Sequence, residues 1–244
     1  CTVVQAGATT VLVDAGISAR RTAQALDALG LGARVDAVFV SHEHSDHCKD
    51  IAVVARRFGC PIYGTAATLE QLAPRLRGGE RLVEVAKRKP LAFQDLEAVC
   101  FSVSHDAVDP GGYTFSDGRR RVGVCTDLGT LTEEVQAHLG ACEAVSFEAN
   151  HDVEMLVNGR YPKYLQDRIR SPLGHLSNDE SGQGLALLAL KGRLRHAVLA
   201  HLSEHNNRPE LALRTVRRCL ETYEVELDVQ LSHKTRPSAL IELG

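Results

Sequence analysis

The chain has 244 residues, of which 44% are hydrophobic and 24% are charged. This length is typical of one large α/β domain, so we expect a single domain over residues 1–244. No apolar run approaches the ~20 residues that a membrane-spanning helix needs, which argues against an integral membrane protein. The formal net charge of −3 excludes a generally basic nucleic-acid coat protein.

Cysteine usage indicates a reducing compartment. The seven cysteines are an odd number and include no CxxC pair, which favours free thiols in the core over a disulfide framework. No secretory signal is visible in the sequence. We therefore expect a cytoplasmic protein, and we expect Cys48 to be a small buried side chain.

The first third of the chain alternates predicted strands and helices. Strands are expected where β-branched residues cluster, and helices are expected where apolar residues recur at helical spacing. The predicted strands are residues 1–5, 9–14, 35–41 and 61–63, with a hairpin across Ala6-Gly7-Ala8. The predicted helices are residues 18–29, 49–58 and 65–72.

The remainder repeats this order. Short strands are expected between residues 81 and 103, with a break at Lys89-Pro90, and a hairpin is expected across Ser116-Asp117-Gly118. Further strands are predicted at residues 112–115, 121–126, 144–148, 197–200 and 225–231. Helices are predicted at residues 131–139, 153–170 with interruptions at Asn158-Gly159 and Pro162, 179–190 and 209–223. Two halves that each begin with strands and end with helices predict two sheets with helices outside.

The most informative segment is His42-Glu43-His44-Ser45-Asp46-His47, which directly follows an apolar run at residues 38–40. Alternation places His42 and His44 on the same side of an extended segment, and we expect Asp46 and His47 in a tight loop. Imidazole and carboxylate groups are ligands for divalent metals. A polar histidine-rich turn is the alternative, but the position at a strand end favours a metal site.

Other segments also place a ligand-type side chain directly after an apolar strand. These residues are Asp14, His105, Asp127 and His201. A rigid scaffold often positions catalytic groups on the loops at its strand ends.

In this order, the motifs resemble those of the metallo-β-lactamase superfamily over nearly the whole chain. The resemblance implies an αββα four-layer sandwich, in which two mixed β-sheets are flanked by helices, with two divalent metal ions. It implies that His42, His44 and His105 bind one ion, and that Asp46, His47 and His201 bind the other. Asp127 would bridge the two ions, and Asp14 would orient ligands without binding metal itself.

Two metal ions can activate a shared water molecule and polarise the bond under attack. Asp46 and Asp127 would then orient this water. The ligand set is compatible with Zn, Mn or Fe and does not choose between them.

Two further segments resemble tRNase Z, and they contain Glu148 and His175. A carboxylate beside a histidine raises the pKa of the imidazole, which could then protonate a leaving alkoxide. The alternative is that Glu148 ends a strand and His175 precedes a helix without catalytic work. Ser177 and Asn178 lie at the N-terminus of the helix predicted at residues 179–190, where free backbone N–H groups could bind a phosphate.

Within the superfamily, the chain is most similar to the YycJ/WalJ-like branch of bacterial hydrolases. The shared segments are residues 41–50, 112–115, 150–156, 174–178 and 200–207. The resemblance implies a cytoplasmic phosphodiesterase that acts on DNA from the 5′ end, with DNA preferred over RNA and no membrane partner. Nucleotide contacts are expected from Tyr113, Asn150, His151, Ser177, Asn178, Asn206 and Asn207.

Three alternatives stay open at this point. The chain could be a thioester or other small-ester hydrolase similar to glyoxalase II, an RNA-directed nuclease, or a metal-binding module without catalysis. The seven-residue ligand set argues against the last of these. Only 21 residues separate His105 from Asp127, which is too short for the long tRNA-binding arm of tRNase Z. The sequence does not predict the oligomeric state.

Overall fold

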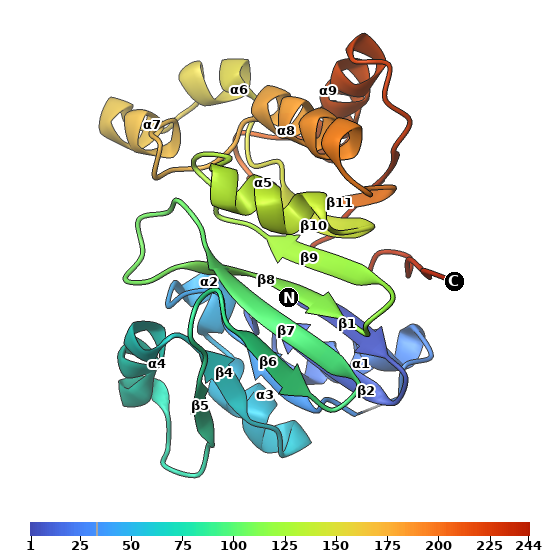
Figure 1. The fold of residues 1–244 in the computed structure, drawn as a ribbon. Coiled ribbons are helices and arrows are strands. Elements are labelled where there is room, and N and C mark those ends of the chain that lie inside the picture. The colour runs from blue at the N-terminus through green and yellow to red at the C-terminus, as the bar shows by residue number, and fades with distance from the viewer. Residues whose placement is uncertain (33) are drawn as a thin grey trace. The chain divides into compact units, whose positions relative to one another are not determined.

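The computed structural model describes residues 1–32 and 34–244. The described residues fall into two compact units. Unit 1 comprises Cys1–Ser102 and Ala107–Arg119, and unit 2 comprises Val103–Asp106 and Arg120–Gly244. Figure 1 labels most of the elements of both units.

Unit 1 contains a five-stranded sheet in the order β1-β2-β3-β4-β5. β1 and β2 form the predicted antiparallel hairpin, and the later neighbours pair in parallel. The strands are β1 (Thr2–Ala6), β2 (Thr9–Val13), β3 (Ala37–Phe39), β4 (Ile62–Gly64) and β5 (Leu82–Glu84). Every residue of β2 is buried, so this strand lies in the core and carries its carboxyl end to the site.

The helices of unit 1 begin and end at recognisable capping residues. Ser18 and Thr65 cap two of them with their side-chain oxygens, and Gly59 ends a third in the left-handed conformation. The helices are α1 (Ala19–Ala28), α2 (Ser45–Cys48), α3 (Ile51–Phe58), α4 (Ala66–Leu72) and the 3₁₀ turn η1 (Ala73–Arg75). Their apolar faces join the sheet in one buried cluster that includes Leu26, Val38 and Val54.

Three further antiparallel strands complete unit 1. They are β6 (Pro90–Phe93), β7 (Leu96–Ser102) and β8 (Gly111–Ser116). Aromatic rings join them to the five-stranded sheet. The Phe39 ring stacks on Tyr63 at 4.8 Å between centroids and meets Phe115 edge-on at 5.1 Å. This layer fixes the strands that lead to the metal-ligand motif.

Unit 2 is built on parallel strands in the order β9-β10-β11-β12. They are β9 (Arg121–Cys125), β10 (Ala144–Glu148), β11 (His196–Ala200) and β12 (Asp228–Leu231). Helices provide the crossovers that parallel strands require. They are α5 (Glu133–Gly140), α6 (Val153–Val157), α7 (Lys163–Ile169), α8 (Asn178–Lys191) and α9 (Pro209–Thr222). Figure 1 shows α5, α8 and α9 beside these strands.

Most predicted elements are present, and the differences have local causes. The predicted tight loop at Asp46 and His47 is wrong, because these residues lie in the one-turn helix α2. The Cys48 N–H donates to the His44 carbonyl at 3.1 Å, and the Lys49 N–H donates to the Ser45 carbonyl at 2.9 Å. The long helix predicted at residues 153–170 is two helices, separated at the predicted Asn158-Gly159 and Pro162 interruption.

All seven cysteines are free, and five of them are buried. Burial raises the pKa of the Cys48 thiol to about 11, so this group stays neutral as expected for a core side chain. Among the described helices, none combines the length and apolar character needed to cross a bilayer.

Candidate active site

The carboxylate of Asp14 organises the metal-ligand motif of unit 1. Its Oδ1 accepts the Ser41 backbone N–H at 2.8 Å. Its Oδ2 accepts the Ser41 hydroxyl at 2.8 Å and lies 2.8 Å from His47 Nδ1. An ionised carboxylate only accepts hydrogen bonds, so the Nδ1–H of His47 is the donor. The other ring nitrogen, Nε2, therefore carries a lone pair that can bind metal.

Two opposing effects set the charge of Asp14. Burial raises the pKa of this carboxyl, but the nearby His47 imidazole lowers it by a larger amount. The net result is a pKa below the ordinary value. Asp14 therefore remains an anion at neutral pH. This charge holds His47 in the tautomer that leaves Nε2 available.

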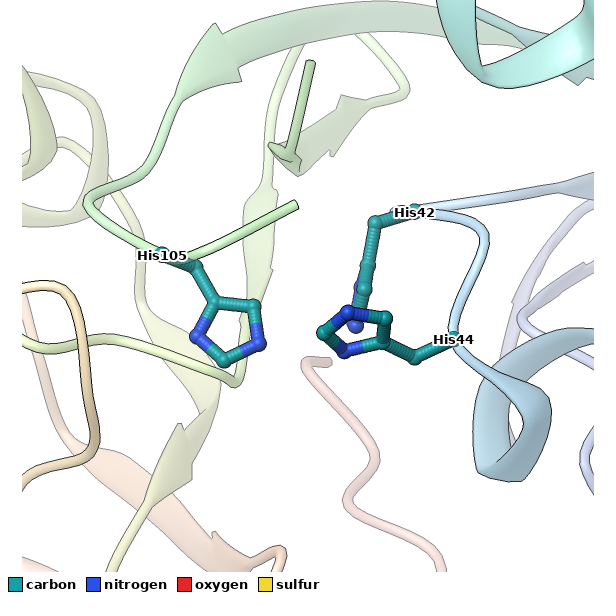
Figure 2. Close-up of side chains that lie close together, drawn as sticks. All are labelled: His42, His44 and His105. Carbon is teal, nitrogen blue, oxygen red and sulfur yellow. The ribbon is translucent and has the colours of Figure 1, made fainter. Parts of the chain in front are cut away.

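His42 and His44 lie next to each other on the segment that follows β3, and Figure 2 shows both side chains. Their ring centroids are 4.6 Å apart. His42 Nδ1 lies 2.9 Å from the Ser41 hydroxyl, which also donates to Asp14. One serine thus links the carboxylate to a predicted ligand. Ser41 was not among the predicted site residues, and its place directly before the first histidine was the available signal.

A close backbone approach positions Asp46 and His47. The Ala15 N–H donates to the His47 carbonyl at 2.7 Å. A Cβ at Gly16 would lie 1.5 Å from the Asp46 carbonyl oxygen, so only glycine fits there. The Asp46 side chain is exposed, and its Oδ2 lies 3.4 Å from His47 Nε2. The Asp14-Ala15-Gly16 turn therefore supports the backbone of two predicted ligands.

In unit 2, the buried carboxylate of Glu148 connects four groups. Its Oε2 accepts the backbone N–H groups of Leu128 at 2.8 Å and Leu176 at 3.2 Å. Its Oε1 lies 2.9 Å from His175 Nδ1 and 2.7 Å from His201 Nδ1. Burial raises the pKa of Glu148, but the hydrogen bonds from the two histidines outweigh it and lower the pKa to about 2. Glu148 is therefore an anion that accepts both Nδ1–H groups.

Asp127 lies at the centre of the histidines of unit 2. Its Oδ1 is 3.5 Å from His105 Nε2, 3.5 Å from His201 Nε2 and 3.8 Å from His175 Nδ1. His105 Nδ1 lies 3.3 Å from the Gly174 carbonyl, which can only accept, so His105 also presents Nε2 as a lone pair. Figure 2 shows His105 on the loop that follows β7.

The same surroundings give the histidines different proton affinities. Burial lowers the pKa of His105, and the nearby Asp127 only partly opposes this, so His105 is neutral at neutral pH. Burial also lowers the pKa of His175, but the Glu148 carboxylate raises it by a larger amount. The net pKa is therefore above the ordinary value. His105 is therefore suited to bind metal, and His175 is suited to carry a proton.

These donors fit a divalent transition metal. His47, His105 and His201 each have Nδ1 engaged by an oxygen acceptor and Nε2 left as the ligand atom, which is the usual arrangement around metal-binding histidines. In unit 2, ligand atoms of four residues lie within 4.8 Å of one another. These residues are Asp127, Glu148, His175 and His201. The predicted metal-ligand chemistry is compatible with this donor set.

Three predicted site residues share an unusual backbone conformation. Asp14, Asp127 and His201 have φ angles of 65°, 57° and 58°, which lie in the left-handed region. Asp14 and His201 directly follow β2 and β11, and Asp127 follows β9 after one residue, at points where the chain turns sharply. Non-glycine residues in this region cost about 1–3 kcal/mol and are concentrated at functional sites.

The seven residues predicted to contact nucleotide are all buried. Tyr113 is 1% exposed, and its hydroxyl donates to the Val40 carbonyl at 2.7 Å. The side chains of Asn178 and Asn207 bond to each other at 2.9 and 3.0 Å. The other residues of this set, which are also buried, are Asn150, His151, Ser177 and Asn206.

Hydrogen bonds give several of these residues a role inside the protein. Asn207 Nδ2 donates to the backbone carbonyls of Ala149 and Asn150, and Asn150 Nδ2 donates to the His201 carbonyl at 3.0 Å. Ser177 caps α8 in a capping box with Glu180. The predicted nucleotide contacts stay predictions, and the geometry assigns these groups to support of the His201 and His175 loops.

Comparison with known proteins identifies the family. A model described as the β-lactamase superfamily domain matches residues 9–202. The chain belongs to the β-lactamase superfamily. This membership confirms the predicted hydrolase class and the predicted resemblance.

Two curated relatives match most of this chain. The chain is 36% identical over 216 residues to "Exodeoxyribonuclease YycJ" of Bacillus anthracis, with 86% of this chain and 81% of the relative covered. It is 34% identical over 213 residues to "Exodeoxyribonuclease WalJ" of Streptococcus pneumoniae serotype 2, with 84% and 78% covered. The predicted similarity to the YycJ/WalJ-like branch is therefore confirmed.

A solved structure supports the fold assignment. The metallo-β-lactamase fold protein YhfI from Bacillus subtilis aligns with a TM-score of 0.68 at 19% identity, covering 94% of this chain and 87% of that chain. At this identity the likeness shows the fold alone. The predicted fold class, two mixed β-sheets flanked by helices, is confirmed.

Proposed function

We propose that this protein is a metal-dependent exodeoxyribonuclease that hydrolyses phosphodiester bonds in DNA, acting from the 5′ end. Two relatives named exodeoxyribonuclease share 34–36% identity with the chain over most of its length, which supports a DNA substrate. The resemblance to the YycJ/WalJ-like branch supports the direction of attack. We also propose a cytoplasmic location, in keeping with the free cysteines.

The observation that carries this proposal is the pair of histidines held by Glu148. Cleavage of a phosphodiester bond releases an alkoxide, which is a strong base and leaves far more easily when an acid protonates it. His175 Nδ1–H donates to Glu148, so the proton for the leaving group would come from Nε2. A thiolate leaving group is stable near neutral pH and needs this acid much less. The Glu148–His175 pair therefore favours an oxygen ester over a thioester.

We propose that the metal ligands are those implied by the family resemblance. They are His42, His44, Asp46 and His47 of unit 1, and His105, Asp127 and His201 of unit 2. When bound, divalent cations in such a site supply Lewis-acid polarisation of the phosphoryl group and lower the pKa of water. We propose two ions, and Zn, Mn and Fe are each compatible with nitrogen and carboxylate donors.

The protein residues around these ligands fix orientation and charge. Asp14 holds His47, and Glu148 holds His201, each through an ionised carboxylate that accepts the Nδ1–H group. Asp46 and Asp127 would accept hydrogen bonds from the attacking water and so orient it. Glu148 also raises the pKa of His175, which keeps the proposed acid protonated at neutral pH.

The test is digestion of end-labelled oligonucleotides by protein reconstituted separately with Zn, Mn and Fe. Single- and double-stranded DNA and RNA are compared, each labelled at the 5′ or the 3′ end, with an acyl-thioester as the control substrate. We expect short labelled products from 5′-labelled DNA at early times and little thioester hydrolysis. Faster thioester hydrolysis than DNA cleavage, under every metal, would reject the proposal.

A further inference from the structure

The segment between Glu148 and His175 contains an exposed basic and aromatic surface. It is formed by residues 160–170, which include four basic residues and one acidic residue, although the whole chain has a net charge of −3. Tyr164 projects from this segment and is 75% exposed. Among the large hydrophobic residues that the structure describes, this is the highest exposed fraction. We call residues 160–170 the basic segment.

Helical periodicity divides α7 into an inner and an outer face. Leu165, Gln166 and Ile169 are buried or half-buried, whereas Lys163, Tyr164 and Arg168 are exposed. Tyr164 and Arg168 are four residues apart, so they are neighbours on the outer face. The packing of unit 2 does not explain an exposed aromatic ring beside a cation.

The inner face attaches this helix firmly to unit 2. The buried Gln166 amide donates to the Tyr161 carbonyl at 2.9 Å and to the Val157 carbonyl at 3.4 Å, which joins α7 to the end of α6. Gly159, between the two helices, has no room for a Cβ, which would lie 2.6 Å from the Met155 carbonyl. Figure 1 shows α6 and α7 as a pair of short helices next to α8.

The end of α7 is joined directly to the loop that carries His175. The His175 N–H donates to the Ile169 carbonyl at 2.8 Å. A Cβ at Gly174 would lie 2.1 Å from the same carbonyl oxygen, so the two segments pass in close contact. The Pro172 carbonyl accepts hydrogen bonds from the side chains of Ser104 and Thr130. A ligand bound along α7 would therefore lie on a surface with a fixed connection to the proposed acid.

We propose that the basic segment is a binding platform for single-stranded DNA next to the catalytic histidine, and this rests on the proposed nuclease function. Tyr164 would stack on a base, while Arg160 and Arg170 would neutralise backbone phosphates. Aromatic rings beside cations are the usual platform for single strands, because every base has a face on which a ring can stack. The platform binds without reading sequence and holds the strand that is being shortened.

The other two cations of the basic segment, Lys163 and Arg168, already pair with carboxylates. Lys163 Nζ lies 2.7 Å from Asp167 Oδ1, and Arg168 Nε lies 2.5 Å from Asp106 Oδ2. Both already have a carboxylate partner, and Arg168 contacts the neighbour of His105. Substitutions for the test are therefore placed at Tyr164, Arg160 and Arg170.

The first test measures equilibrium binding of a fluorescent single-stranded oligonucleotide in the presence of chelator, so that no cleavage takes place. Loss of one stacking contact weakens binding about 5- to 150-fold. We expect this for Tyr164→Ala, with most of the affinity restored in Tyr164→Phe. Tyr223→Ala, which removes a tyrosine that is 48% exposed at the end of α9, is the matched control and should bind as the wild type does.

The second test measures the salt dependence of the same binding. Each phosphate contact contributes about 0.7 to the slope of log K against log salt for a single strand. The double variant Arg160→Ala and Arg170→Ala should therefore lower this slope by about 1.4. Arg214→Ala and Arg217→Ala, two exposed arginines of α9, form the control pair and should leave the slope unchanged.

The outcomes separate this inference from the proposed function. Wild-type affinity in Tyr164→Ala, or an equal loss in Tyr223→Ala, would overturn the platform while DNA cleavage by the wild type still stood. Weaker binding in Tyr164→Ala, together with a larger loss of polymer cleavage than of hydrolysis of a small phosphodiester, supports it. Because Tyr164 is largely exposed, its substitution should leave the melting temperature unchanged.

Discussion

Glu148 Oε1 lies 2.7 Å from His201 Nδ1, a predicted metal ligand, as well as 2.9 Å from His175 Nδ1. One carboxylate therefore connects metal binding to the proposed proton transfer. Only the pairing of Glu148 with His175 was predicted from the sequence. The additional contact changes what substitution of Glu148 should do.

We expect Glu148→Gln and His175→Ala to differ in metal content. Both should slow cleavage of DNA by ~10²–10⁴-fold. His175→Ala removes the proposed acid, and Glu148→Gln removes the carboxylate that orients this acid and raises its pKa. Only Glu148→Gln should also weaken metal binding, by about 10–100-fold, because it removes the carboxylate that orients His201. Metal content after dialysis and single-turnover cleavage measure the two effects.

The control for this comparison is His196→Gln. His196 is also on β11, but it lies at the start of that strand, where Nδ1 is 3.1 Å from Asp228 Oδ2. It should leave metal content and cleavage unchanged. Equal metal affinity in Glu148→Gln and the wild type would show that the contact with His201 has no functional role.

The rate of DNA cleavage should fall at alkaline pH. The pKa of His175 is raised above its ordinary value of 6.5, so the protonated form persists above that pH and is lost as the pH rises through the raised pKa. In Glu148→Gln the fall should move to lower pH, because the anion that raises the pKa is gone. The measurement is kcat against pH.

A substrate with a nitrophenolate leaving group provides the control, since this anion leaves without protonation. Its alkaline fall should be weak or absent. An identical alkaline fall for both substrates would argue that some other group titrates.

Asp14→Asn should destabilise unit 1 in a pH-dependent way. The buried carboxylate accepts three hydrogen bonds, and loss of its charge should cost about 1.5–3 kcal/mol at pH 7. The pKa of Asp14 is lowered in the folded protein. Its contribution to the free energy of unfolding is therefore present above the unfolded pKa of about 3.9, and it is lost as the pH falls through the folded pKa. Urea unfolding of metal-free protein between pH 3 and 7 measures the difference, which should shrink at low pH. A constant difference would contradict this assignment.

Gly16→Ala should disrupt the metal-ligand motif. The new Cβ would lie 1.5 Å from the Asp46 carbonyl oxygen, which forces the backbone of α2 away from the Asp14 turn. We expect lower stability and loss of bound metal. Gly140→Ala is the matched control, because no atom lies within 4 Å of the new Cβ, and removing a glycine from α5 should stabilise by about 0.5–1 kcal/mol. Thermal melts and metal analysis would distinguish the two variants.

Removal of divalent metal should abolish cleavage of DNA, and addition of Zn, Mn or Fe should restore it. Asp127→Asn should prevent this recovery, because its carboxylate is within 3.5 Å of ligand atoms on His105 and His201. Full turnover after exhaustive chelation would contradict the proposed metal chemistry.

Local pattern was enough to predict most elements of this fold. Capping at Ser18, the glycine at residue 59 and the β-branched run of β2 mark boundaries through short-range physics, so their elements lie within a few residues of the prediction. The one-turn helix α2 was missed because four residues are too few to show a helical period. It is held by contacts with the Ala15 backbone, which is distant in sequence.

The candidate site was predicted through the order of its motifs rather than through geometry. The sequence shows that Glu148 ends a strand, but it does not show that Ala200 is its partner in the parallel register. That register puts His201 beside the Glu148 carboxylate. The nucleotide contacts expected of Asn178 and Asn207 raise a similar difficulty, because both side chains are buried and burial depends on residues distant in sequence.

The left-handed backbone at Asp14, Asp127 and His201 affects how variants of this protein should be read. Alanine at any of these positions removes a functional group and also adopts a torsion angle that a β-carbon disfavours. An alanine scan would thus overstate the chemical contribution of these side chains, with part of the measured loss coming from the main chain. Glycine tolerates the torsion, and asparagine does so better than alanine, so these two replacements isolate the chemistry.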